Sequence, residues 1–539
     1  MGGDLDTAPS TRRGPGGPPS EGLEKTPSMA SLVSNQPTRS CVPLPSPRRA
    51  RARTGGALVT ATVVLAVFVL PGLQEAQPTA AATSRPTQAR PAPGSLSDTR
   101  ALAGWWDASH TTFPAPPLIT HSLVVERLRA LNESDPRFFP LEEIGRSVEN
   151  RPLLAVTVGR GPTHVLLWSQ MHGDEPTATP ALFDLLELLR VHRDAPPVAR
   201  VLDALTLTIV PMLNPDGAER FERRNAQSID VNRDALRLQT PEGHALKALR
   251  DRLSPAVGFN LHNQGWRTSL GDPPQPASIS LLSVAFDKPL TDSPGRQLTR
   301  RLCVVIRDAI EPLAGTRIGR YSDEFEARAF GDNITRWGTP VVLIETGAWP
   351  GPDPDPPLVR INFVAIAAAL DALATGRVAE ADPQGYEALP LNDDRLLHTI
   401  IRNVTIVAGT GVPPFTGDVG VVAQRIVRGV DGLRRLGLLA RIDDIGDLRT
   451  MGALDVVDGT GLTLAPLFLP GASPGQEVTL PDWTAVAPSP QTITVGQPAW
   501  FLLLRPIPAT GALEDLATVR RYRVERVIAI GEADAGRRP

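Results

Sequence analysis

The chain has 539 residues and carries 55 Lys and Arg against 58 Asp and Glu, a formal net charge of −3. That length is enough for about two or three domains. The charge is nearly balanced and no basic patch stands out in the central region, which argues against nucleic acid as a partner. Proline is abundant, at 55 residues, and many prolines fall in the N-terminal tail and in segments that read as linkers.

The first 53 residues are rich in Pro, Ser, Gly and Arg and have no apolar periodicity. Residues 1–53 are therefore predicted to be a disordered, basic N-terminal region. Within residues 54–82, an apolar stretch over 57–70 follows that basic tail and precedes the small residues 79–82. A basic region, a short apolar region and a small-residue site are typical of an export signal.

The apolar stretch is shorter than the roughly 20 residues of a membrane-spanning helix, and an uncleaved membrane anchor is the alternative. We expect an exported protein, periplasmic or secreted, that contacts a membrane only through this N-terminal segment. Residues 83–112 are expected to be a linker. Cys303 is the only cysteine beyond the signal, so the exported part can form no intrachain disulfide.

The region over 113–376 alternates apolar strand-like runs with stretches of helical spacing. Strands are predicted over 164–168, 205–210 and 341–344, and helices over 181–189, 298–310 and 362–373. Such alternation implies an α/β domain, a sheet flanked by helices.

A histidine and a glutamate follow the first predicted strand, in Met171-His172-Gly173-Asp174-Glu175-Pro176. Imidazole and carboxylate both bind zinc, and a catalytic zinc needs three protein ligands with one position open. His262, after the apolar run Gly258-Phe259-Asn260-Leu261, is the candidate third ligand. The HxxE spacing alone occurs by chance in many proteins, and a histidine after a strand is often a surface or capping residue.

Further motifs follow in order: Asn214-Pro215-Asp216-Gly217, then Arg223-Arg224-Asn225 with Asp230-Val231-Asn232-Arg233, and the strand end Glu345-Thr346-Gly347. Together with HxxE and His262, these motifs resemble the zinc carboxypeptidases, the carboxypeptidase A-like metallopeptidases. The resemblance covers roughly residues 113–375. It implies a catalytic domain over 113–376 that binds one Zn2+ per chain through His172, Glu175 and His262.

Zinc lowers the pKa of its bound water and polarises a carbonyl. Glu345 is expected to be the general base that takes the water's proton and passes it to the leaving amine. The alternative is a buried carboxylate paired with a nearby arginine. A glutamate directly after four apolar strand residues favours the functional role, because burying an unpaired carboxylate is costly.

The resemblance also implies substrate-contacting residues. Arg223 matches the arginine that stabilises the developing oxyanion, with Arg224 as the alternative. Asn232 and Arg233 match the pair that binds the substrate's terminal carboxylate, which suits the planar guanidinium. Tyr321 is a candidate for the mobile substrate-binding tyrosine, although its local sequence fits a chance occurrence equally well. The alternative for all of these residues is a solvated, charged loop.

The segment Asn263-Gln264-Gly265-Trp266 departs from the serine-containing segment common in the family and leaves the side-chain specificity unreadable. We expect an exported zinc metallocarboxypeptidase that hydrolyses a bond next to a carboxylate, in a peptide or an N-acyl amino acid. A non-catalytic binding protein on a degenerate peptidase scaffold is the alternative.

Residues 392–539 read as strands separated by many turns. Segments 402–415, 457–466 and 494–500 are similar to the small β-sandwich of amidohydrolases of the D-aminoacylase and dihydroorotase kind. The metal-binding barrel of that family is absent, and no His-x-His follows Pro466. The resemblance implies a smaller all-β sandwich domain without hydrolase chemistry, and an ordinary accessory β-domain is the alternative.

Overall fold

The computed structural model describes residues 94–409, 412–430, 433–467, 471–481, 492–508 and 519–530. The predicted disordered region and the predicted export signal or anchor lie outside these residues. Residues 86–539 cluster as one compact unit that contains both sheets described below.

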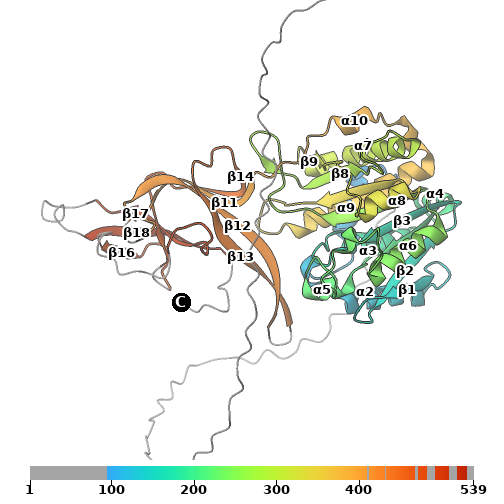
Figure 1. Ribbon diagram of the computed structural model, residues 1–539, viewed down its shortest axis with the longest axis horizontal. Helices are drawn as coiled ribbons and strands as arrows, with labels where there is room; N and C mark the ends of the chain where they lie inside the picture. The colour runs from blue at the N-terminus through green and yellow to red at the C-terminus, as the bar shows by residue number, and fades with distance from the viewer. Residues whose placement is uncertain are drawn as a thin grey trace, which may run out of the picture. The chain divides into compact units, whose positions relative to one another are not determined.

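An eight-stranded mixed sheet organises the first part of the described chain (Figure 1). Its strands run in the order β1 (Leu141–Arg146), β2 (Pro152–Gly159), β4 (Leu205–Val210), β3 (Thr163–Ser169), β5 (Val257–Asn263), β10 (Val341–Thr346), β8 (Ile279–Ser283) and β9 (Ile318–Arg320). Neighbours among β4, β3, β5 and β10 are parallel. These four central strands are buried almost throughout, as their near-continuous apolar sequences require.

Helices cover both faces of this sheet, and each face has its own apolar core. One core includes residues of α1 (Thr99–Ser109), α2 (His121–Ser134), α3 (Ala178–Val191), α4 (Pro196–Ala204), α7 (Pro294–Ala314) and α9 (Asp355–Thr375). The other core includes residues of α6 (Pro241–Leu253) and α8 (Phe330–Arg336). The predicted α/β class is confirmed, and the helices predicted over 181–189, 298–310 and 362–373 lie within α3, α7 and α9.

The helix α9 is as long as α7, at 21 residues, and is the more apolar of the two. Among the described residues it is the one helix long and apolar enough to cross a membrane, and 78% of its apolar window is buried inside the protein. Proline in its first turn and Gly376 in the left-handed conformation (φ 76°) after its last residue set its two ends.

Two predicted boundaries are wrong. The linker predicted over 83–112 contains α1, where Leu102, Trp105 and Trp106 occupy one helical face and are buried against the core. The catalytic domain predicted to end at 376 continues, because Tyr386 and Leu389 are buried in the same core. The Tyr386 hydroxyl accepts a hydrogen bond from the Ser283 backbone N–H at 3.1 Å.

The later part of the chain forms a separate sheet, as predicted for an all-β domain. Its order is β13 (Leu433–Gly446), β12 (Phe415–Val430), β11 (Leu396–Ile406), β15 (Thr463–Pro466), β17 (Trp500–Pro506), β18 (Val519–Ala529) and β16 (Glu477–Pro481), and β14 (Gly452–Asp458) pairs with β11. The segment 494–500 is mostly a turn that leads into β17 rather than a strand. The kinship with amidohydrolase β-sandwiches stays a prediction.

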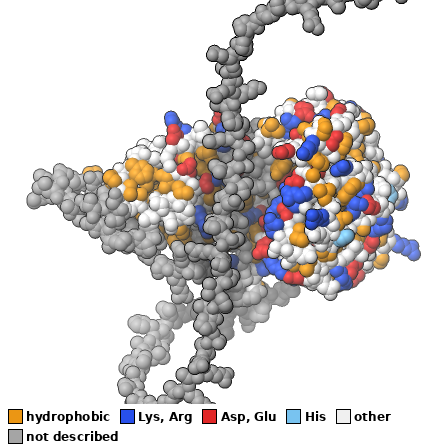
Figure 2. Space-filling view, in the orientation of Figure 1, with side chains coloured by type: hydrophobic (Ala, Val, Ile, Leu, Met, Phe, Trp, Pro, Cys, Tyr) orange, Lys and Arg blue, Asp and Glu red, His pale blue; other side chains and the backbone are white. Residues whose placement is uncertain are grey.

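Charged side chains of both signs are interspersed over the α/β domain on the face shown in Figure 2. On that face, cationic side chains do not gather into one large patch.

Candidate metal centre and active site

The candidate metal ligands and base meet where the central parallel strands end. His172 and Glu175 lie in the turn after β3, and His262 is the penultimate residue of strand β5. Glu345 on β10 is the register partner of His262. Because parallel strands present their carboxyl ends at one edge, residues far apart in sequence converge there.

The turn that carries His172 packs against the Asn-Pro-Asp-Gly motif. A Cβ at Gly173 would lie only 2.0 Å from the Gly217 carbonyl carbon, so only glycine fits between these two backbones. Asn214 caps α5 (Pro215–Arg220), its side-chain oxygen accepting from the Gly217 N–H at 2.9 Å. The Asn-Pro-Asp-Gly motif therefore holds the turn that carries His172 in place.

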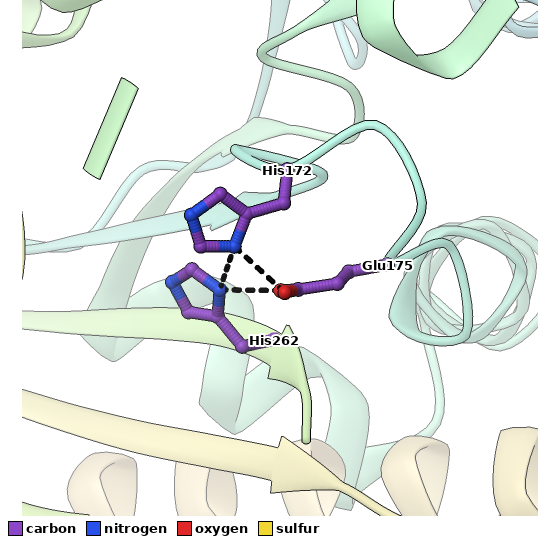
Figure 3. Close-up of side chains that lie close together, drawn as sticks. All are labelled: His172, Glu175 and His262. Atoms are coloured by element: carbon purple, nitrogen blue, oxygen red, sulfur yellow. Dashed lines mark hydrogen bonds and ion pairs between the residues drawn. The ribbon is translucent and has the colours of Figure 1, made fainter. Parts of the chain in front are cut away.

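Three buried side chains point at a common position (Figure 3). Nδ1 of His172 lies 2.7 Å from Oε1 of Glu175, and Nδ1 of His262 lies 2.6 Å from Oε2. The two Nδ1 atoms are 3.2 Å apart. Two imidazole nitrogens and a carboxylate, gathered within 4.8 Å, are a donor set that fits a divalent cation such as zinc.

Asp230 holds His172 from the far side of the ring. Nε2 of His172 lies 3.1 Å from Oδ1 of Asp230, and Arg223 donates from Nε to Oδ2 at 2.9 Å. Burial opposes ionisation of Asp230, but the hydrogen bond from His172 and the Arg223 cation outweigh it and hold its pKa well below the usual range. A carboxylate behind a ligating histidine fixes the ring orientation and raises its basicity.

The structure places Arg223, rather than Arg224, at the centre. Nη1 of Arg223 lies 3.1 Å from Oε1 of Glu175 and 3.1 Å from Nδ1 of His172. Arg224 instead donates to the Ser228 carbonyl at 3.1 Å. Of these two neighbouring arginines, Arg223 is the one that reaches the candidate metal ligands.

Glu345 is buried, and its Oε2 has no hydrogen-bond partner among the described residues. Burial first, and then repulsion from Glu175, raise the pKa of Glu345 well above its usual value. No arginine pairs with it in the part of the chain that the structure describes. The geometry therefore does not support the alternative in which Glu345 forms a structural ion pair with an arginine.

A cavity of about 210 Å3 brings the remaining predicted site residues together with the ligands. Asn232, Arg233 and Tyr321 all line it. The Asn232 side-chain oxygen accepts from the Phe330 N–H at 2.8 Å, and Nε of Arg233 lies 3.4 Å from Oε2 of Glu326. Burial, and then the nearby carboxylates, raise the pKa of Tyr321 to about 12, so its hydroxyl stays protonated.

Comparison with known proteins finds that residues 124–269 match the family model described as zinc carboxypeptidase. The matched region belongs to the zinc carboxypeptidase family. The protein named carboxypeptidase E of Caenorhabditis elegans is 31% identical over 130 residues, which cover 20% of this chain and 27% of that one. Carboxypeptidase D of Rattus norvegicus is 31% identical over 111 residues, 19% of this chain and 8% of that one. The chain thus spans about a quarter or less of the length of these relatives.

Solved structures of lower identity are also similar to this chain. The metallo-carboxypeptidase from Burkholderia cenocepacia has 19% identity and a TM-score of 0.39, covering 47% of this chain and 69% of that one. A metallo-carboxypeptidase from Pseudomonas aeruginosa, solved with (2-guanidinoethylmercapto)succinic acid, has 18% identity and a TM-score of 0.38, covering 48% and 68%.

The predicted family is confirmed, and the matched stretch includes His172, Glu175 and His262. Tyr321 and Glu345 lie beyond its end at residue 269, so their place in this zinc carboxypeptidase domain comes from the structure alone. The departing segment 263–266 contributes to the site: Gln264 donates from Nε2 to the Ala277 carbonyl at 2.7 Å and lines the cavity with Asn263.

Polar residues of this site that the sequence analysis does not single out include Asp230, Asn260 and Asp332. Asn260 precedes His262 by two residues on the same strand, so their side chains share one face, a signal present in the sequence. Asp230 lies inside the motif Asp230–Arg233, but nothing in the motif's spacing indicates its contact with His172. No local pattern points to Asp332, which reaches the cavity from α8.

Asp332 is expected to make the free energy of unfolding of the zinc carboxypeptidase domain depend on pH. Burial raises its pKa to about 7. A carboxyl with a raised folded-state pKa contributes stability that is fully present below its unfolded pKa, near 4, and is lost as pH rises through about 7. The Asp332→Asn protein should therefore gain stability over wild type progressively between about pH 4 and 7 and keep that gain above it.

Urea unfolding across this pH range measures the difference. Asp194→Asn, at an exposed aspartate, is the matched control and should track wild type. A stability difference between Asp332→Asn and wild type that does not change with pH would contradict this account.

Proposed function

We propose that this protein is an exported zinc metallocarboxypeptidase that removes the C-terminal residue of a peptide or splits an N-acyl amino acid. The observation that carries the proposal is the meeting, in one cavity, of the ligand set His172, Glu175 and His262 with the unpartnered carboxylate of Glu345 and the cation of Arg233. Export rests on the sequence pattern over residues 54–82, which lie outside the described part of the chain.

The residues divide the reaction among them. Zinc, held by His172, Glu175 and His262, would supply an acidified water molecule and a polarised scissile carbonyl. Glu345 removes the water's proton and returns it to the leaving amine as the C–N bond breaks, so that water and amide become carboxylate and amine.

Arg223 stabilises the negative charge that develops on the carbonyl oxygen, because its guanidinium already faces the ligand set. Asn232 and Arg233 bind the substrate's terminal carboxylate. Glu326, which pairs with Arg233, also interacts with Arg328, so it can release Arg233 to the substrate without losing its own partner.

Purified protein tested for zinc content and for C-terminal release from a peptide panel, followed by mass spectrometry, tests this function. We expect stoichiometric zinc and release of single residues from free C-termini, with C-terminal amides left intact. Binding of peptides without turnover would favour the degenerate-scaffold alternative. Internal cleavage would show a peptidase of another kind.

A further inference from the structure

Two cavities meet at the candidate metal centre. The cavity of about 210 Å3 described above holds Asn232 and Arg233. A larger cavity, of about 950 Å3, shares five lining residues with it: Glu175, Arg223, Asn263, Gln264 and Gly265. The larger cavity is also lined by residues of β12 and β13. We call this β12–β13 lining the strand wall, defined by Val422–Arg425, Leu439, Arg441 and Asp443.

The two cavities define a direction for a bound peptide, on the basis of the proposed function. A terminal carboxylate on Asn232 and Arg233 places the last residue in the smaller cavity. The scissile bond then lies at the shared residues beside Glu175 and Arg223. The chain upstream of that bond has to continue into the larger cavity, against the strand wall.

The strand wall is fixed to the α/β domain by charged contacts on both strands. Arg425 of β12 donates to Asp355 at 2.6 Å, and its guanidinium carbon lies 5.3 Å from the Trp266 ring centroid. Asp443 of β13 accepts from Arg267 at 2.6 Å. The side chains of Arg425 and Asp355 are only 16% and 10% exposed, so this pair lies in a largely water-excluded contact where charge-assisted bonds are strong.

A third contact holds the far end of the β12–β13 hairpin. Arg434 donates from Nη2 to the Pro117 carbonyl at 3.0 Å and from Nη1 to the Glu219 carbonyl at 2.7 Å. Contacts at three separate points make the strand wall a built surface of the cavity. It is not a gap left between two loosely joined domains.

One charged side chain of the strand wall, Arg441, has no ion-pair partner among the described residues. Arg425 and Arg267 have carboxylate partners, and Arg223 belongs to the metal centre. Arg441 lines the cavity, is exposed, and has no ion-pair partner among the described residues. A free guanidinium in a substrate channel suits a carboxylate.

We propose that the strand wall binds the part of a peptide substrate upstream of the scissile bond, and that Arg441 pairs with an acidic side chain in that part. The β-domain is then a subsite of the enzyme. Substrates too short to reach the wall, such as N-acyl amino acids, gain nothing from it.

The test compares wild type, Arg441→Gln and a matched control, Arg435→Gln, on three substrates. Arg435 lies on the same strand and is exposed, but lines neither cavity. The substrates are an N-acyl amino acid and two hexapeptides with the same C-terminal residue, one carrying Glu and the other Gln at the upstream positions. We expect Arg441→Gln to lower kcat/KM on the Glu peptide by about two- to fivefold, as loss of an exposed ion pair gives.

The other two substrates should be turned over equally by all three proteins. Equal effects of the two arginine substitutions on the Glu peptide would overturn the role of Arg441. If wild type turns over the hexapeptides with no higher kcat/KM than the N-acyl amino acid, the strand wall is not a subsite.

A second readout separates this proposal from the proposed function. Fluorescence anisotropy of the labelled Glu peptide on Glu345→Gln protein, with and without Arg441→Gln, measures binding without turnover. Weaker binding with Arg441→Gln supports the strand wall as a peptide-binding surface, whether or not wild type hydrolyses the peptide. Absence of hydrolysis by wild type would contradict only the proposed function. Unchanged binding would refute the pairing with Arg441.

Discussion

The Glu345→Gln protein is expected to keep its zinc and to lose about 10²–10⁴ in kcat, the range that general acid–base catalysis contributes. Glutamine preserves the shape of the side chain but cannot accept a proton from water. Glu345 is not a member of the ligand set, and its Oε2 has no partner, so the substitution removes proton transfer and leaves the metal site in place. Zinc content and steady-state rates on the same preparation measure both effects.

Glu324→Gln is the control for this experiment. Glu324 lines the same cavity but is exposed to solvent, and its substitution should leave the rate close to that of wild type. Near-normal turnover by Glu345→Gln would remove Glu345 from the mechanism, and loss of zinc would show that it supports the metal as well.

Replacement of His262 with alanine is expected to abolish stoichiometric zinc binding. A catalytic site has three protein ligands, and loss of an outer-shell partner alone typically weakens metal binding by about 10–100-fold, so loss of a ligand should exceed that. The substitution also leaves Glu175 without the contact at 2.6 Å that helps to balance its buried charge. A bound metal stabilises the folded state. At saturating zinc, the thermal midpoint of His262→Ala should therefore be lower than that of wild type.

Metal analysis after dialysis and thermal unfolding with added zinc measure these effects. His244→Ala, at an exposed histidine on α6, should bind zinc as wild type does. A full complement of zinc in His262→Ala would mean that the third ligand is another residue.

The convergence of the candidate metal ligands could be predicted from the sequence, because each candidate lies at or just after a recognisable apolar strand. His172, Glu175, His262 and Glu345 stand at or just beyond strands that the sequence marks clearly, and parallel strands bring such ends together. The choice between Arg223 and Arg224 could not be made in this way. Neighbouring side chains in a loop differ in direction only once the loop is folded.

Other features depend on contacts between distant segments. The apolar spacing of Leu102, Trp105 and Trp106 was present in the sequence, but the proline-rich stretch around it favoured a linker. Tyr386 is buried only because α7 and β8 lie beside it. The role of Arg441 is equally invisible in its own strand, because the cavity that it lines is completed by loops of the other domain.

The pairing of Glu345 with His262 across β10 and β5 ties the chemistry to the assembly of the sheet. The distance between the proposed base and the proposed metal ligand is set by backbone hydrogen bonds between neighbouring strands, not by the conformation of a flexible loop. A slip of one residue along either strand would turn one of these side chains to the opposite face. Recovery of turnover after chemical denaturation would therefore report that the central strands have regained their correct register. Spectroscopic measures of total strand content cannot distinguish the correct register from a shifted one.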